Sequence, residues 1–222
     1  MKKENSVLMD EAKASLKGRW PVAIAALFVI STLSFAINFI PKMGAIASLI
    51  ISGPVTLGIA IFSLKLSRNQ DIKFEDIFTG FNHFFISLKA YIVMIVYVFL
   101  WALLLIIPGI VKAIAYSMTF FILADDPTLG AREALKKSRA LMNGYKWKYF
   151  FLNLRFLGWA LLCILTLGIG FLWLIPYVQV TLAKFYEDLK NNPTPTTPPA
   201  QTQEIIVKIE KIEPPLEAQP LA

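Results

Sequence analysis

The chain has 222 residues, of which 56% are hydrophobic and only 17% are charged, and its net charge is +7. Soluble domains carry about 25% charged residues, and a soluble core of this size could not bury so much apolar surface. These values exclude an ordinary soluble domain. They also favour anionic lipid over nucleic acid as the partner of the basic residues, which lie beside the apolar runs.

Long apolar runs predict six membrane-spanning helices, near residues 20–40, 44–64, 90–107, 109–124, 149–167 and 171–187. The run from Ala90 to Ala124 contains one charged side chain, Lys112. As a single helix it would be about 52 Å long, whereas a hydrocarbon core is about 30 Å thick. We therefore expect two crossings with a hinge at Pro108–Gly109. The first run begins only at Trp20 and further runs follow it, so we expect a retained helix and not a cleaved signal peptide.

Short links join the runs in pairs, which predicts an all-α membrane protein of six transmembrane helices in three hairpins. Basic residues are concentrated in the segments that precede these hairpins: Lys2, Lys3, Lys13, Lys17 and Arg19; Lys65, Arg68, Lys73 and Lys89; and Arg132, Lys136, Lys137, Arg139, Lys146 and Lys148. The short turns on the opposite side offer only Lys42 and Lys112. The positive-inside rule therefore predicts that both termini and both long connections are cytoplasmic.

Each predicted hairpin follows a short amphipathic stretch that ends at a glycine. These glycines are Gly18, Gly80 and Gly144, and aromatic residues follow each of them. A three-fold internal repeat would explain the regular spacing. The alternative is that any helix lying at a membrane interface before a hairpin has this composition.

The connection 127–145 has the clearest helical pattern. Small and apolar residues recur every three or four positions, at Ala131, Ala134, Leu135, Ser138, Leu141, Met142 and Tyr145. We expect Asp126 to cap this helix, Pro127 to begin it and Asn143–Gly144 to end it. The opposite face and the adjoining residues are basic and predict contact with anionic lipid headgroups, through Arg132, Lys136, Lys137, Arg139, Lys146 and Lys148.

The chain changes character after the last apolar run. Residues 1–190 are predicted to form the membrane domain, and residues 191–222 a proline-rich, disordered cytoplasmic tail. The alternating stretch from Ile205 to Ile209 leaves open a strand that pairs with a sheet edge of a partner protein.

A few polar residues and prolines lie inside or next to the apolar runs. Arg155 lies about two helical turns beyond Lys148, where an arginine is expected to extend to the interface, to line an anion pocket or to pair with Asp125. Asp125 and Asp126 could also hold a cation or do acid–base work, but a helix end and cap before Pro127 is the favoured interpretation. Gln179 and the helix-kinking residues Pro54, Pro108 and Pro176 complete the set.

Ordered motifs from Ala124 to Leu189 resemble a bacterial integral-membrane family, domain of unknown function 975. They are Ala124-Asp125-Asp126-Pro127, Glu133-Ala134, Ser138-Arg139, Leu141-Met142, Gly144, Lys146-Trp147-Lys148, Gly158-Trp159, Gly168-Ile169-Gly170, Pro176-Tyr177 and Phe185-Tyr186. The resemblance implies a multi-pass protein of the bacterial inner membrane and implies no activity. The chain is more loosely similar to the membrane domains of some glycerophosphodiester phosphodiesterases, which would imply an accessory module.

The chain offers no set of residues for catalysis, a metal or a cofactor. His83 is the only histidine, and neither a nucleophile–base pair nor a cluster of metal ligands can be assembled around it. We therefore predict a non-enzymatic scaffold or accessory factor that associates with anionic lipid, and with a protein partner or a second copy of the chain. The alternative is a small transporter or channel that uses the kinks at Pro54 and Pro176 together with Arg155.

Overall fold

The computed structural model describes residues 3–37, 44–104 and 106–192, which are helical and contain no strand. The elements are α1 (Asn5–Leu16), α2 (Trp20–Ile37), α3 (Gly44–Ser67), the 3-10 helix η1 (Phe74–His83), α4 (Phe84–Leu104), α5 (Ile106–Tyr116), α6 (Thr119–Asp125), α7 (Ala131–Leu141), α8 (Lys146–Leu165) and α9 (Phe171–Asn191). The all-α prediction is confirmed. The predicted tail and the turn at Lys42 lie outside the described residues.

Five helical stretches are long and apolar enough to cross a membrane: Trp20–Ile37, Ile46–Ser67, Phe74–Leu103, Ile107–Asp125 and Lys146–Leu165. Many of their large apolar side chains face outward, including Leu103 and Leu165, which are 75% and 80% exposed. Such surface is costly in water and suits lipid. The sixth predicted crossing, in α9, is not among the five, because charged side chains occupy the last third of that helix.

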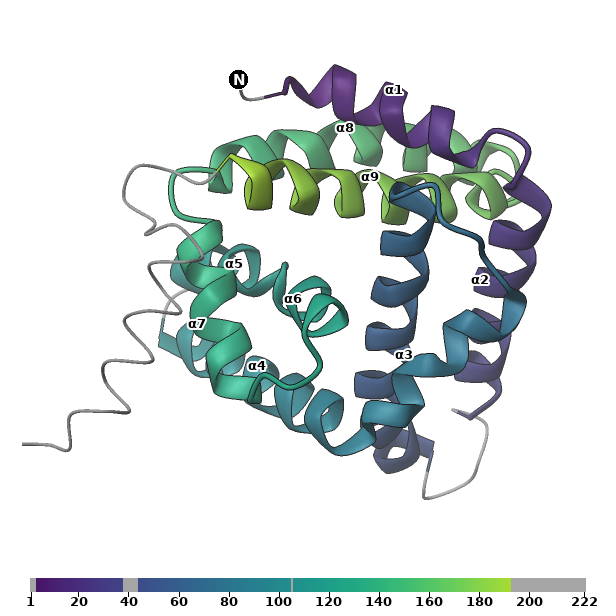
Figure 1. Cartoon of the computed structure of the whole chain (residues 1–222). Coiled ribbons are helices and arrows are strands. Elements are labelled where there is room, and N and C mark those ends of the chain that lie inside the picture. The colour runs from purple at the N-terminus through teal and green to yellow at the C-terminus, as the bar shows by residue number, and fades with distance from the viewer. Residues whose placement is uncertain (1–2, 38–43, 105, 193–222) are drawn as a thin grey trace, which may run out of the picture. The chain divides into compact units, whose positions relative to one another are not determined.

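The helix pairs of the predicted hairpins, α2–α3, α4–α5 and α8–α9, are each in contact, and the pairs also pack across one another. In Figure 1, α8 and α9 run together across one end of the α2–α3 pair, and α1 lies along them. Helix α9 contacts α1, α2 and α3 in addition to α8. Its buried residues include Val180, Ala183 and Phe185, so α9 forms part of the core.

The fourth predicted crossing is broken into two helices. Helix α5 ends at Tyr116 and α6 begins at Thr119. The break is held by α7, where the Ser138 hydroxyl accepts a hydrogen bond from the Met118 amide at 3.2 Å and donates one to the Ala115 carbonyl at 2.9 Å. The crossing predicted over 109–124 is therefore present as the stretch Ile107–Asp125, but it contains a break that no proline or glycine marks.

The predicted hinge residues Pro108 and Gly109 lie in α5, which packs against α4. Helix α4 ends at Leu104 and Pro108 falls in the first turn of α5, where the missing amide hydrogen of a proline costs nothing. Gly109 is needed for close packing, because a Cβ atom there would lie 2.7 Å from Cα of Ala102 in α4.

The three regularly spaced glycines do not play one role. Gly18 and Gly144 have positive φ angles of 77° and 80° and end α1 and α7 in the left-handed conformation that glycine tolerates. Gly80 instead lies inside η1, which packs along α3, and a Cβ atom there would collide with the backbone of Pro54 and Gly58. The middle copy of the predicted repeat therefore differs from the other two.

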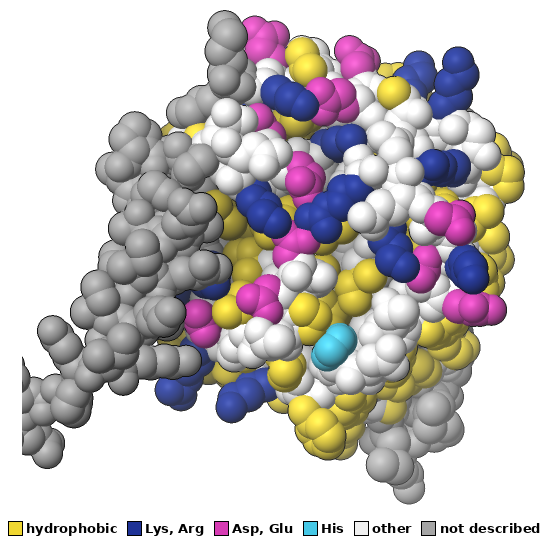
Figure 2. Space-filling view, viewed as in Figure 1, with side chains coloured by type: hydrophobic (Ala, Val, Ile, Leu, Met, Phe, Trp, Pro, Cys, Tyr) yellow, Lys and Arg dark blue, Asp and Glu magenta, His cyan; other side chains and the backbone are white. Residues whose placement is uncertain are grey.

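Charged and apolar side chains occupy different parts of the surface. Figure 2 shows Lys, Arg, Asp and Glu side chains intermingled over the viewed face, with apolar side chains gathered toward its lower and right-hand edges. This division is typical of a protein that presents one surface to water and another to lipid.

Candidate functional site

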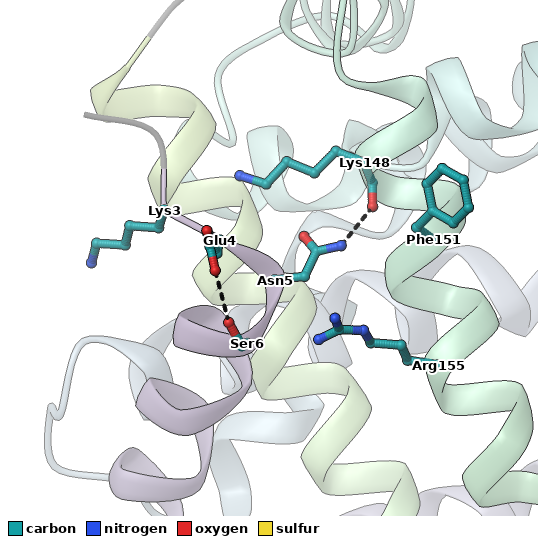
Figure 3. Close-up of a pocket in the computed structure, with 7 residues that line it drawn as sticks. All are labelled: Lys3, Glu4, Asn5, Ser6, Lys148, Phe151 and Arg155. Carbon is teal, nitrogen blue, oxygen red and sulfur yellow. Dashed lines mark hydrogen bonds between the residues drawn. The ribbon is translucent and has the colours of Figure 1, made fainter.

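A cavity of about 440 Å³ lies where the start of α1 meets the first half of α8 (Figure 3). Its lining residues are Lys3, Glu4, Asn5, Ser6, Lys148, Phe151 and Arg155. Its volume falls in the range of about 300–1,000 Å³ that is usual for ligand pockets, although this one is open to its surroundings. The cavity contains two of the predicted site residues, Arg155 and Lys148.

Helix periodicity places the α8 side chains on one face. Lys148, Phe151 and Arg155 are spaced three and four residues apart, so they line the same side of α8. The other wall is fixed by Asn5, whose side-chain amide donates a hydrogen bond to the Lys148 carbonyl at 3.1 Å. The Arg155 side chain extends from α8 toward the first turn of α1 (Figure 3).

The lining carries three positive charges and one carboxylate, Glu4. Lys3 pairs with Glu11 at 2.6 Å and Lys148 pairs with Asp188 at 2.9 Å. Arg155, by contrast, makes no ion pair or side-chain hydrogen bond to any residue within 3–37, 44–104 or 106–192. Carboxylates outside the lining therefore neutralise the two lysines, and the cavity's cation without a carboxylate partner in the described part of the chain is the Arg155 guanidinium.

The predicted pairing of Arg155 with Asp125 is wrong. Asp125, at the end of α6, accepts hydrogen bonds from Arg68 at 2.5 Å, from Lys190 at 2.7 Å and from the Tyr186 hydroxyl at 2.8 Å. Three donors already surround this carboxylate, and its side chain is only 12% exposed. It therefore fastens α6 to α3 and α9.

The same cluster contains a second carboxylate. Arg68 donates hydrogen bonds to Glu187 through Nε at 2.9 Å and through a terminal nitrogen at 2.6 Å. Partial burial lowers the pKa of Arg68, but its hydrogen bonds to Asp125 and Glu187 outweigh that effect and hold the pKa above its ordinary value. We call Arg68, Asp125, Glu187 and Lys190 the ion-pair cluster.

Sequence reasoning did not identify the ion-pair cluster as a unit. Arg68 and Asp125 are 57 residues apart and lie at the ends of two different apolar helices, and no local pattern shows that these ends meet. The sequence signal for this site is a carboxylate directly after an apolar run. This signal identifies Asp125 but not the residues that bind it. Among the described residues, no three His, Cys, Asp or Glu side chains are placed to share a metal ion.

The basic face predicted for the 127–145 connection exists on α7. Arg132, Lys136 and Arg139 are exposed, whereas Lys137 approaches Glu133 at 3.8 Å. The opposite face, with Ala134, Leu135 and Ser138 among its residues, is buried against neighbouring helices, and those residues do not face lipid. Lys146, at the start of α8, is half-buried.

The start of α7 differs from the prediction. The helix begins at Ala131 after Gly130, and not at Pro127. The Asp126 carboxylate accepts hydrogen bonds from the amide and the hydroxyl of Thr128, which closes a local turn before the helix.

Gln179 lies in a second cavity, of about 330 Å³, between α8 and α9. Eight other residues line it: Asn153, Phe156, Leu157, Ala160, Phe171, Leu174, Ile175 and Val178. Pro176 is buried in α9, and Pro54 lies inside α3 where η1 crosses it. Pro54 and Pro176 thus lie where helices pack closely together.

The comparisons with known proteins agree with the motif analysis. A family model described as "Protein of unknown function (DUF975)" matches residues 1–115 and 103–193. The two matches together span the helical part of the chain, which confirms the resemblance. No curated protein and no solved structure matches the chain.

Proposed function

Because the chain belongs to the DUF975 family, whose function is unknown, we propose a function from the structure alone. The protein is a multi-pass scaffold or accessory factor of the bacterial inner membrane, without enzymatic activity. Its helices cross the membrane six times, both termini are cytoplasmic, and its basic cytoplasmic surface holds anionic lipid together with a protein partner or a second copy of the chain.

The distribution of ion pairs is the observation that carries this proposal. Within the described residues, each of the seven ion pairs joins the N-terminal segment, residues 65–76, residues 125–148 or the end of α9. These are the segments that the positive-inside rule places in the cytoplasm. Lys112 is an exception: it comes from a turn predicted to lie outside, but it lies within electrostatic range of Arg139 and Lys146, and its ammonium lies over the Trp101 ring at 4.5 Å. One charged cytoplasmic side explains the ion pairs.

Helix α9 is the proposed sixth crossing. Lys148 near the start of α8 pairs with Asp188 near the end of α9, so α9 returns the chain to the side from which α8 begins. The charged side chains that make α9 less apolar are partnered: Glu187 binds Arg68, and Lys184 donates a hydrogen bond to the Ser67 carbonyl. Partnered charges of this kind are tolerated at the end of a crossing.

Reporter fusions test the topology. We expect fusions at Gln70 and Thr128 to report the cytoplasm and a fusion at Gly168 to report the opposite side. The crosswise α8–α9 pair makes Gly168 the decisive position (Figure 1). A cytoplasmic signal from Gly168 would mean that α8 and α9 lie along the membrane, and six crossings would be wrong.

The exposed cations of α7 support the role in lipid binding. Arg132, Lys136 and Arg139 lie on one exposed face, and each basic residue near an anionic surface contributes about 1 kcal/mol. The purified protein in detergent should therefore bind phosphatidylglycerol more tightly than phosphatidylcholine by native mass spectrometry. Replacing these three residues by Gln should reduce that preference. Equal binding of both lipids by the wild type would refute the lipid role.

The transporter alternative is tested separately. Saturable uptake of a solute into proteoliposomes, lost when Arg155 is replaced, would overturn the scaffold proposal. Native mass spectra of the same sample also count copies of the chain and show whether a partner copurifies.

A further inference from the structure

The cavity at Arg155 has the chemistry of a site for one particular part of a lipid. We propose that it binds the phosphate group of an anionic phospholipid, and that an acyl chain of the same lipid lies along the α8 face that continues from Arg155. This inference rests on the proposed function, because it assigns the lipid association to one site.

The charge of Arg155 selects an anion. Lys3 and Lys148 each have a carboxylate partner, but Arg155 has none within the described residues. An arginine beside apolar surface is costly unless it is hydrated or paired. An anion bound in the cavity would be the partner of Arg155 that the polypeptide itself does not provide.

The geometry suits phosphate in particular. A guanidinium presents parallel N–H groups that match two oxygens of a phosphate, which a lysine ammonium cannot do. The first turn of α1 forms the facing wall, and the first amide groups of a helix lack intrahelical acceptors and favour negative charge. Glu4, at the N-cap of α1, makes no side-chain capping bond to these amides.

The surface next to the cavity suits an acyl chain. Gly158, Leu162 and Leu165 continue the helical face of Phe151 and Arg155 at three- and four-residue spacing. A Cβ atom at Gly158 would meet nothing within 4 Å, so the helix surface is open directly beyond Arg155. Leu162 and Leu165 are 56% and 80% exposed. A chain attached to the bound phosphate would cover this apolar strip.

Two variants separate the binding of the phosphate from the binding of the acyl chain. Arg155→Gln removes the guanidinium, and Gly158→Leu fills the strip without changing a charge. Lys13→Gln is the control for the first, because Lys13 is an exposed cation on α1 that lies outside the cavity lining and is not among the α7 cations. Gly130→Leu is the control for the second, because a Cβ atom at Gly130 also meets nothing within 4 Å.

The experiment compares a lipid with a free anion. Native mass spectrometry of the full chain in detergent measures the affinity for dioleoyl phosphatidylglycerol, with phosphatidylcholine as the uncharged reference. Isothermal calorimetry measures the affinity for inorganic phosphate. Circular dichroism and thermal unfolding confirm that each variant is folded.

We expect Arg155→Gln to weaken phosphatidylglycerol binding at least about 10-fold, since one charge-assisted hydrogen bond contributes about 1.5–3 kcal/mol. Gly158→Leu should weaken the lipid several-fold and leave inorganic phosphate unchanged. Lys13→Gln should weaken binding by less than about 5-fold, because one exposed charge contributes about 1 kcal/mol or less. Gly130→Leu changes no charge and should leave binding unchanged.

Three results would overturn the inference in distinguishable ways. Unchanged lipid binding in Arg155→Gln, with weaker binding in the α7 variants, would remove this site and leave the proposed function intact. Loss of phosphate binding in Arg155→Gln, with normal lipid binding in Gly158→Leu, would identify a free phosphate as the ligand. No preference of the wild type for phosphatidylglycerol would remove the site and the lipid role together.

Discussion

Arg68 and Arg155 are both arginines next to an apolar helix, but the chain treats their charges in opposite ways. Arg68, just after α3, binds Asp125 and Glu187 at 2.5–2.9 Å. Arg155, inside α8, has no carboxylate partner in the described part of the chain and lies in a cavity with two lysines. The first charge is used to hold helices together, and the second remains available to a ligand.

This difference separates stability from binding. A guanidinium with two carboxylates stabilises the fold, because removing either side leaves partly buried charges without a partner. A guanidinium with no internal partner contributes little to the fold and can be replaced at little cost. Variants of the ion-pair cluster should therefore change the stability of the fold, whereas variants of Arg155 should change lipid binding.

The largest loss of stability is expected for Asp125→Ala. The change leaves Arg68 with Glu187 alone and removes the acceptor of Lys190 and Tyr186. We expect the free energy of unfolding to fall by about 2–3 kcal/mol, measured by titration with SDS. Asp126→Ala is the matched control, since Asp126 closes only a local turn with Thr128. Equal effects of the two changes would contradict the assigned role of the ion-pair cluster.

Lys148 belongs to the cavity lining and also forms an ion pair with Asp188. Its replacement should therefore affect both lipid binding and stability. Lys148→Ala leaves the Asp188 carboxylate, 2% exposed, without its lysine, although Asn192 still donates to it at 3.2 Å. We expect a loss of about 1–2 kcal/mol of unfolding free energy together with weaker phosphatidylglycerol binding. A loss of binding at unchanged stability would mean that Lys148 serves the cavity alone.

The shape of the Arg68 guanidinium can be tested at constant charge. Arg68→Lys keeps the positive charge but cannot bind Asp125 and Glu187 with the same planar group, so we expect a loss of about 1 kcal/mol. Arg132→Lys on the exposed face of α7 should lose nothing measurable. Wild-type stability of Arg68→Lys would show that net charge, and not the geometry of the guanidinium, holds the cluster.

The sequence predicts the local elements of this fold well. Apolar runs and helical periodicity identify five spanning stretches and the buried face of α7, because both signals are carried by neighbouring residues. The stop at Gly144 is also predictable, since few other residues adopt its positive φ angle.

The sequence does not predict which distant segments meet. Arg68 and Asp125 lie at the ends of two helices that are far apart in the sequence, so only the folded chain shows that they pair. The break after Tyr116 depends on Ser138, 20 residues after Met118, and has no local signal. The sequence identified the two cations that α8 contributes to the cavity, Lys148 and Arg155, but not the wall formed by residues 3–6, which lie far away in the sequence.

The smallest change of stability is expected for Arg155→Leu, and this is the strictest test of the comparison. No internal partner loses its charge, so the unfolding free energy should change by less than about 0.5 kcal/mol. Phosphatidylglycerol binding should fall, and in the wild type it should weaken as salt rises, because the cavity is open to the solvent ions that screen it. The ion-pair cluster, with Asp125 only 12% exposed, should respond less to the same salt. A marked loss of folded protein in Arg155→Leu would mean that this arginine, like Arg68, holds the structure together.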